Sequence, residues 1–321
     1  MGRYLLTRLA FALALVFIVS SAALLLTRIA PGDFASSQGV DLTIQERERL
    51  RDTLGLNQSF TAQYLSWLGG AVHFDFGRSL LYSRPVSSLV SERALNTAVL
   101  AISALLIATL IGIPLGIYSG TTTGAGRSIV RAVSTLGISV PPLIGSLALV
   151  FLAARTGWLP VGGMTSSAGA DLTWLQWFGD LAQHLPLPAI ALAIPMAATL
   201  ERLQSEAIAA ASHERFVAAS QARGVDRTRA ILHHAWPVSL RPVLGLYGVM
   251  IGTLFSGSFV VEVVTSWPGL GRLMFDALKA RDLFLVAGCA ATGALFLAAG
   301  TLITDLLLAY TDPRVGSGER H

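Results

Sequence analysis

The sequence predicts an all-α membrane protein with six spanning helices. Hydrophobic residues make up 53% of its 321 residues and charged residues only 13%, which leaves too little charge to cover a soluble surface. Windows without Asp, Glu, Lys or Arg recur along the chain, and each can hold a helix that crosses a bilayer core of roughly 30 Å. The windows are residues 9–27, 94–126, 132–154, 181–200, 242–261 and 283–304.

The first window could be mistaken for a secretory signal, because Arg3 and Arg8 precede an apolar run. The run is long, however, and it ends in Ala30-Pro31-Gly32 without a small-residue cleavage pattern. We therefore expect residues 1–29 to be retained as the first transmembrane helix.

The arginines predict the orientation of the spans. With the amino terminus inside, the short cytoplasmic segments collect positive charge, as the positive-inside rule requires. These segments hold Arg3, Arg8, Arg127, Arg131, the cluster from Arg202 to Arg241, Arg314 and Arg320. Both termini are then cytoplasmic, and the basic balance of 23 Lys and Arg against 19 Asp and Glu implies no nucleic-acid binding.

This orientation predicts four regions along the chain. The first helix is followed by an extracytoplasmic lobe at residues 30–93, which contains a helix-like stretch from Thr43 to Leu54. A five-helix core follows at residues 94–311, and a cytoplasmic tail covers residues 312–321. The lobe has either a structural role or a contact with a delivering protein.

Small residues and prolines mark the expected packing of the core. Gly112, Gly116 and Gly120 lie four apart, which places them on one helix face and predicts close helix contact. Pro141-Pro142 in the third window and Pro195 in the fourth predict kinks, which either shape a cavity or fit neighbouring helices. The single cysteine, Cys289, lies mid-span and is expected to pack.

Two outer loops carry recognisable signals. Trp158, Trp174 and Trp177 suit the membrane interface, where an amphipathic ring is half wet. The loop Trp267-Pro268-Gly269-Leu270-Gly271-Arg272 predicts a tight turn and then a short helix that ends near Asp282.

The charge-rich segment at residues 201–241 lies between two membrane-length runs. Its composition predicts a helix from Arg202 to Ala222, which Gly224 can stop in the left-handed conformation. Asp226 can cap a second helix that runs toward Pro237. A multispan protein has little reason to build such a polar elbow unless a cytosolic partner grips it.

Here the sequence resembles the permease subunits of bacterial ATP-binding-cassette importers. Their cytoplasmic loop reads Glu-Ala-Ala, three residues, Gly, nine residues, then Ile-x-Leu-Pro. Counting from Gly224 places Ala218, Ala219 and Ser220 on the Glu-Ala-Ala positions and Pro237 on the proline. The second Ala, the Gly and the Pro match, whereas Ala218 stands where the family has a glutamate.

The resemblance is to the dipeptide, oligopeptide and nickel branch of these permeases, and it covers nearly the whole chain. It is carried by Ala30-Pro31-Gly32-Asp33, Leu54-Gly55-Leu56, Gln63-Tyr64, Gly112-Ile113-Pro114-Leu115-Gly116, Ser220-Gln221-Ala222-Arg223-Gly224, His234-Ala235, Pro242-Val243, Val261-Glu262, Trp267-Pro268-Gly269-Leu270-Gly271, Arg281-Asp282 and Asp312-Pro313-Arg314. The ordered coincidence of these short motifs is far more specific than any one of them.

The resemblance implies a type I permease-like fold in the bacterial inner membrane and a defined set of partners. These are a homologous second permease, two ATP-binding-cassette ATPases and an extracytoplasmic solute-binding protein. Ala218, Ala219, Ser220, Gly224 and Pro237 would couple the chain to an ATPase. The sequence has no Gly-x-x-x-x-Gly-Lys-Ser/Thr loop, so ATP and Mg²⁺ are expected on the ATPase subunits, with no cofactor and no catalytic residue here.

The implied cargo is a short peptide or a related small solute such as a nickel chelate. An ion-gradient-driven secondary transporter is the alternative, but it needs acids along the path, and the charge-free windows hold none at mid-membrane. A membrane scaffold is a third possibility, which loss of uptake on deletion would exclude.

Two acids near the ends of spans are candidates for the path or a gate. Glu262 closes the fifth span and Asp305 the sixth, and each either contacts substrate or only pairs or caps a helix. His233 and His234 are adjacent, so on a helix they point about 100° apart, and no carboxylate or cysteine lies at ligand spacing. We therefore expect no metal site.

Overall fold

The computed structural model describes residues 2–37, 43–53, 57–71, 73, 75–166 and 173–311. These residues are helical or irregular, apart from one isolated β-bridge between Arg78 and Pro85, which confirms the all-α class. Three sequence features named above lie outside the described residues. They are Leu54-Gly55-Leu56, the predicted tail at residues 312–321 with its Asp312-Pro313-Arg314 motif, and the arginines of that tail.

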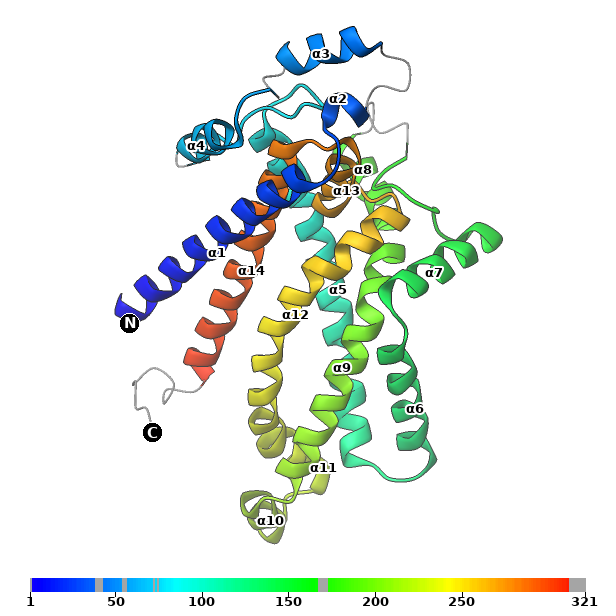
Figure 1. Cartoon of the computed structure of the whole chain (residues 1–321). Coiled ribbons are helices and arrows are strands. Elements are labelled where there is room, and N and C mark those ends of the chain that lie inside the picture. The colour runs from blue at the N-terminus through cyan, green and yellow to red at the C-terminus, as the bar shows by residue number, and fades with distance from the viewer. Residues whose placement is uncertain are drawn as a thin grey trace. The chain divides into compact units, whose positions relative to one another are not determined.

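Five described helices are long and apolar enough to cross a membrane. Four of them lie in α1 (Gly2–Ile29), α5 (Val86–Thr121), α9 (Pro186–Ser212) and α14 (Leu283–Thr311), and the fifth covers residues 227–254, which include most of α12 (Trp236–Val264); all five helices are labelled in Figure 1. A sixth span is present if the bent pair α6 (Ala125–Ser139) and α7 (Pro142–Thr156) counts as one.

The prediction of a continuous, merely kinked third span is wrong. The axes of α6 and α7 differ by 103°, so the window at residues 132–154 is broken rather than kinked. Val140 and Pro141 are both extended, because each precedes a proline and the proline ring disfavours the helical conformation of the residue before it. Pro142 then begins α7, where its missing N–H leaves no helical bond unmade.

The chain divides into two compact units. The first comprises residues 1–98 and 268–298, and the second comprises residues 99–267 and 299–321. Because α5 and α14 contribute to both, the units do not follow the predicted order of lobe and core. The predicted boundaries at residues 30, 94 and 312 stay predictions.

The first unit contains α1, four shorter helices and parts of α5 and α14. The shorter helices are α2 (Phe34–Ser37), α3 (Ile44–Thr53), α4 (Phe60–Ala71) and α13 (Leu270–Ala280). Helix α3 confirms the helix predicted from Thr43 to Leu54, and α13 confirms the helix predicted after the Pro-Gly turn. Leu24 of α1, Trp67 of α4 and Ala287 of α14 share one apolar cluster, which joins α4 to two candidate spans.

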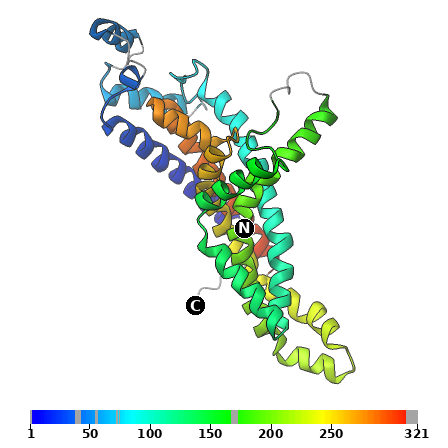
Figure 2. The same ribbon diagram turned by 90° about the vertical axis from the view of Figure 1, so that its right-hand side faces the viewer.

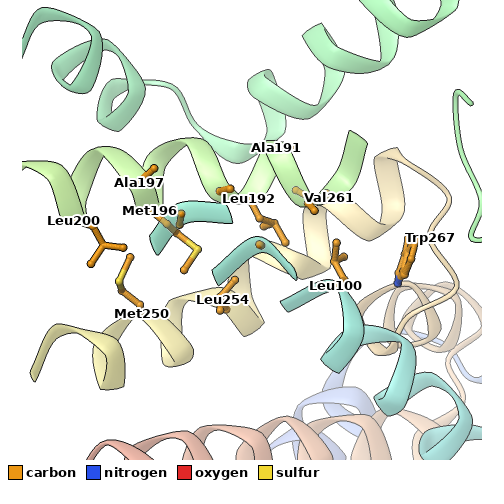
Figure 3. Packing of buried hydrophobic residues seen from close by; sticks show 14 of the residues in the cluster. Leu100, Ala191, Leu192, Met196, Ala197, Leu200, Met250, Leu254, Val261 and Trp267 are labelled. Atoms are coloured by element: carbon orange, nitrogen blue, oxygen red, sulfur yellow. The ribbon is translucent and has the colours of Figure 1, made fainter. Parts of the chain in front are cut away.

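The second unit is built around α9. Helices α6, α7, α8 (Trp174–His184) and α12 all contact α9. Side chains from α5, α9 and α12 point into the space that these helices enclose, as Figure 3 shows for Leu100, Leu200 and Met250. This apolar cluster fixes the spacing of the three spans.

Glycines bring α5 and α9 into backbone contact, as predicted. A Cβ added at Gly112 would lie 2.6 Å from the Ala197 carbonyl oxygen, and one at Gly120 would lie 2.4 Å from that of Ser205. Any larger residue would push the two helices apart. The glycine face is therefore an α5–α9 contact.

The prolines of the bent pair and of α9 meet at a cavity. A volume of about 270 Å³ lies between α7, α9 and α12, and Pro142 and Pro195 both line it. The structure thus favours the prediction that these prolines shape a cavity over the alternative that they only fit neighbouring helices, because their kinks border an open volume.

Candidate functional site

The segment at residues 201–241 forms a helical elbow at one end of the second unit. Helix α9 ends at Ser212, and α10 (Arg215–Ala222) and α11 (Arg227–Ala230) follow it. Both views place α10 and α11 beyond the ends of α9 and α12 (Figures 1 and 2). We call residues 213–235 the elbow.

The prediction of one helix from Arg202 to Ala222 is wrong, because the chain turns at His213 and Glu214. Glu214 is extended, with φ −67° and ψ 148°, and its carbonyl oxygen accepts from the N–H of Val217 at 3.0 Å. The turn lets Val217 enter the same apolar cluster as Ile208 of α9, which a straight helix would prevent. Burial of apolar side chains thus overrides the helix propensity of this alanine-rich stretch.

Gly224 adopts the left-handed conformation that the sequence predicts. Its φ is +88°, and its N–H donates to the Gln221 carbonyl oxygen at 2.9 Å. No heavy atom lies within 4 Å of the position that a Cβ would take. The backbone conformation, rather than lack of space, therefore requires glycine here.

We call α10 and α11 the first and second arms of the elbow. Asp226 precedes the second arm, again as predicted. Its carboxylate accepts a hydrogen bond from the Thr228 N–H at 2.9 Å, which caps α11. The two arms are thus separated by a short turn that contains Gly224 and Asp226.

The second arm does not stop at Pro237. A π-helical turn, η2 (Ile231–Ala235), joins α11 to α12, so the arm continues directly into a span. Pro237 has no N–H to donate, and its ring would crowd the carbonyl group four residues earlier, which widens the preceding turn. The arm and α12 therefore form one continuous helical rod.

Apolar side chains hold the elbow on the base of the spans. Ile208, Ala211, Val217, Ala230, Ile231 and Ala235 form one buried cluster. These residues come from α9, from both arms and from η2. A small apolar core therefore packs the elbow against the end of α9.

The predicted coupling residues divide between two faces of α10. Ala218 and Ala219 are exposed, and Phe216 beside them has an exposed fraction of 41%. Ser220 instead faces the elbow core and is 1% exposed. Gly224 and Pro237 are exposed too, but Pro237 belongs to α12 and lies apart from α10 in the chain.

A buried polar network above the elbow was missed from the sequence. The Ser119 hydroxyl of α5 donates to the carboxylate of Glu201 of α9, and the Gln204 amide of α9 donates to the Ser239 hydroxyl of α12 at 2.8 Å. All four side chains are at most 2% exposed. The signal was available: Glu201 and Gln204 lie three apart, on the α9 face that meets the glycines of α5.

Two models of one family of transport proteins together match most of the chain. Residues 112–317 match the binding-protein-dependent transport system inner membrane component, and residues 1–101 match the N-terminal model for the membrane component of such systems. The chain belongs to this family. It is a permease subunit of an ATP-binding-cassette importer, which agrees with the resemblance seen in its motifs.

Relatives that match over nearly their full length support the same assignment. The permease is 30% identical over 319 residues to the oligopeptide transport system permease protein AppB of Bacillus subtilis. It is 34% identical over 323 residues to a putative peptide transport system permease protein of Brucella abortus. In both cases the match covers 98% of this chain and 99% of the relative. These comparisons give no support to an ion-gradient-driven secondary transporter.

The other candidate residues have separate surroundings in the permease. Glu262 is fully buried near the end of α12, whereas Asp305 is half-buried in α14. His233 and His234 are exposed on η2. Across the described ranges, no group of three His, Cys, Asp or Glu side chains is placed to hold a metal ion.

Proposed function

We propose that the permease imports short peptides across a bacterial inner membrane. In this proposal it pairs with a second permease, is driven by two cytosolic ATPases that hold ATP and Mg²⁺, and receives cargo from an extracytoplasmic binding protein. Both termini and the elbow face the cytoplasm. The names of the relatives support the cargo, since several are peptide or oligopeptide permeases.

The observation that supports coupling is the form of the elbow. Helix α10 presents Phe216, Ala218 and Ala219 to solvent while Val217 anchors its other face. A short helix that exposes an aromatic side chain and two small alanines suits a groove on a partner protein. We propose that this face docks on the ATPase.

Force would pass from the elbow into the membrane by two routes, one along α12 itself and one through hydrogen bonds between the spans. The second arm is continuous with α12, so a push on the elbow moves that span directly. The Gln204–Ser239 and Ser119–Glu201 hydrogen bonds tie α12 to α9 and α9 to α5. Rigid-body movement of packed helices is an established way to switch a transporter.

The cavity between α7, α9 and α12 is a candidate part of the cargo path. Its lining is largely apolar, with the hydroxyl groups of Thr199 and Thr253 as polar points. Such a surface would let varied side chains pass without binding them tightly. The path or gate roles of Glu262 and Asp305 stay predictions.

Co-purification and stimulated ATP turnover test the proposal together. The tagged permease should bring down an ATPase and a second permease, and the reconstituted complex with its binding protein should hydrolyse ATP faster when short peptides are added. A nickel chelate serves as the competing cargo. Stimulation by the chelate but not by peptides would overturn the cargo, whereas absence of any ATPase would overturn the assembly itself.

A further inference from the structure

A cavity of about 270 Å³ lies beside the start of α13 in the first unit, far along the chain from the elbow. Its lining combines residues of α5, of α13 and of two loops. Six of them are Tyr82, Arg93, Pro268, Gly269, Arg272 and Asp276. The Trp267-Pro268-Gly269 motif thus contributes part of a pocket, a role that coupling does not explain.

Hydrogen bonds hold this pocket in shape. The Pro268 carbonyl oxygen accepts from the Asn96 amide at 2.8 Å and from the Arg93 guanidinium at 3.2 Å. The Leu270 N–H donates to the hydroxyl of Thr97, which is 4% exposed, at 2.7 Å. Because the loop is fixed on α5 in this way, little order would have to be gained when a ligand binds.

The charges of the lining favour an anion. The lining contains two guanidinium groups, those of Arg93 and Arg272, and one carboxylate, that of Asp276. Burial raises the pKa of the Tyr82 hydroxyl, and Asp276 raises it further while both arginines oppose the rise. Tyr82 is therefore a neutral hydroxyl beside two cations. Guanidinium groups match the planar geometry of a carboxylate, which they can bind through two hydrogen bonds.

The order of elements along the chain places the pocket on the outer side. In the orientation predicted from the arginines the elbow is cytoplasmic, and because α12 has membrane length, the segment that follows it is expected on the outer side. Beside the pocket, α13 exposes Phe275 and Leu278, with exposed fractions of 36% and 43%. Aromatic, aliphatic and arginine side chains together are typical of a protein interface.

We propose that the pocket between Arg93 and Arg272 receives an acidic side chain of the extracytoplasmic binding protein. The inference rests on the proposed assembly and adds the contact that positions the delivering protein. The acidic side chain would lie between the two guanidinium groups, while the exposed apolar side chains of α13 pack around it.

Binding of the purified binding protein to the reconstituted importer tests this. The importer is placed in phosphatidylcholine nanodiscs, which removes anionic lipid as a competitor. Arg93→Gln and Arg272→Gln should each lower the affinity about tenfold and make it less sensitive to salt. Arg93→Lys should lose less affinity, because lysine keeps the positive charge but lacks the planar guanidinium group that can donate two parallel hydrogen bonds to a carboxylate. Arg49→Gln, on α3 and outside the pocket lining, should bind as the wild type does.

Three outcomes would count against the proposal, and they are distinguishable. Wild-type affinity and salt dependence in both Gln variants would overturn the pocket alone. A loss confined to the cargo-loaded binding protein would assign the carboxylate to the cargo instead. Failure of the wild-type importer to bind any binding protein would overturn the proposed assembly as well. Thermal unfolding of each variant complex shows that a loss of affinity is not a loss of folding.

Discussion

Ser119 of α5 donates a hydrogen bond to the carboxylate of Glu201 of α9, and both side chains are buried. The bond lies next to the glycine contact between the two helices, since a Cβ at Gly116 would meet the Glu201 carbonyl oxygen at 2.7 Å. A carboxylate with so little access to water depends on its protein partners. This contact therefore ties α5 to the helix that carries the elbow.

Ser119→Ala should destabilise the permease by about 1.5–3 kcal/mol, because it leaves a buried carboxylate without a donor. Unfolding of the detergent-solubilised protein gives the measurement. Ser128→Ala is the matched control, since Ser128 is exposed and bonds only its own helix, at 3.4 Å. Equal stability of the two variants would contradict the importance of the Ser119–Glu201 bond.

Gly116→Ala should cost about 1–3 kcal/mol through overpacking, because its Cβ would lie 2.6 Å from the Gln204 Cβ. Gly245→Ala is the opposite case. It lies within α12 with nothing within 4 Å of a new Cβ, so a gain of about 0.5–1 kcal/mol in helix propensity is expected. Thermal unfolding of both variants checks the sign of each change, and a gain in both would refute the close α5–α9 contact.

Gly224→Val should leave the permease inserted but uncouple uptake from ATP hydrolysis. A β-branched residue at φ +88° is strained by roughly 1–3 kcal/mol, which should deform the turn between the two arms. Gly224→Asn is the control, because asparagine tolerates positive φ better than other residues. The number of peptides imported per ATP is the readout. Normal coupling in the Val variant would count against the role of the elbow.

The contact between Asp33 and α3 should weaken in acid. Burial alone would raise the pKa of Asp33, but hydrogen bonds from Arg51 at 2.7 Å and from the Ser36 N–H at 2.9 Å outweigh it and lower the pKa below 3.8. A lowered pKa means that the stabilisation is complete at neutral pH and is lost as the pH falls below that value. Hydrogen exchange in α3 should therefore quicken in acid, and Arg51→Gln should remove most of this dependence while Arg49→Gln keeps it.

Features with a local cause could be predicted from the sequence. Gly224 and Asp226 fix a helix stop and a helix start through their own backbone and side-chain chemistry. The helix at residues 44–53 and the Pro-Gly turn before α13 are of the same kind. Each depends on a few consecutive residues, so a single sequence contains the necessary information.

Features that depend on residues far apart in the sequence were missed or wrongly predicted. The turn at His213 exists because Val217 packs with Ile208 and Ala230, which is not visible from the alanine-rich sequence. The 103° bend between α6 and α7 needs two extended residues in succession, where one proline would only kink a helix. Glu201 lay at the edge of a charge-free window, and its partner Ser119 is 82 positions away.

The uninterrupted passage from the elbow through η2 into α12 has a mechanical consequence. The rod covers residues 227–264 and is roughly 57 Å long, so a bilayer core of roughly 30 Å would enclose only part of it. If a membrane holds such a rod between its ends, a sideways displacement of the elbow end tilts the rod and moves its other end in the opposite direction. In the proposed importer, such a tilt would move the two ends of α12 in opposite directions relative to α9 without any bending of the rod itself.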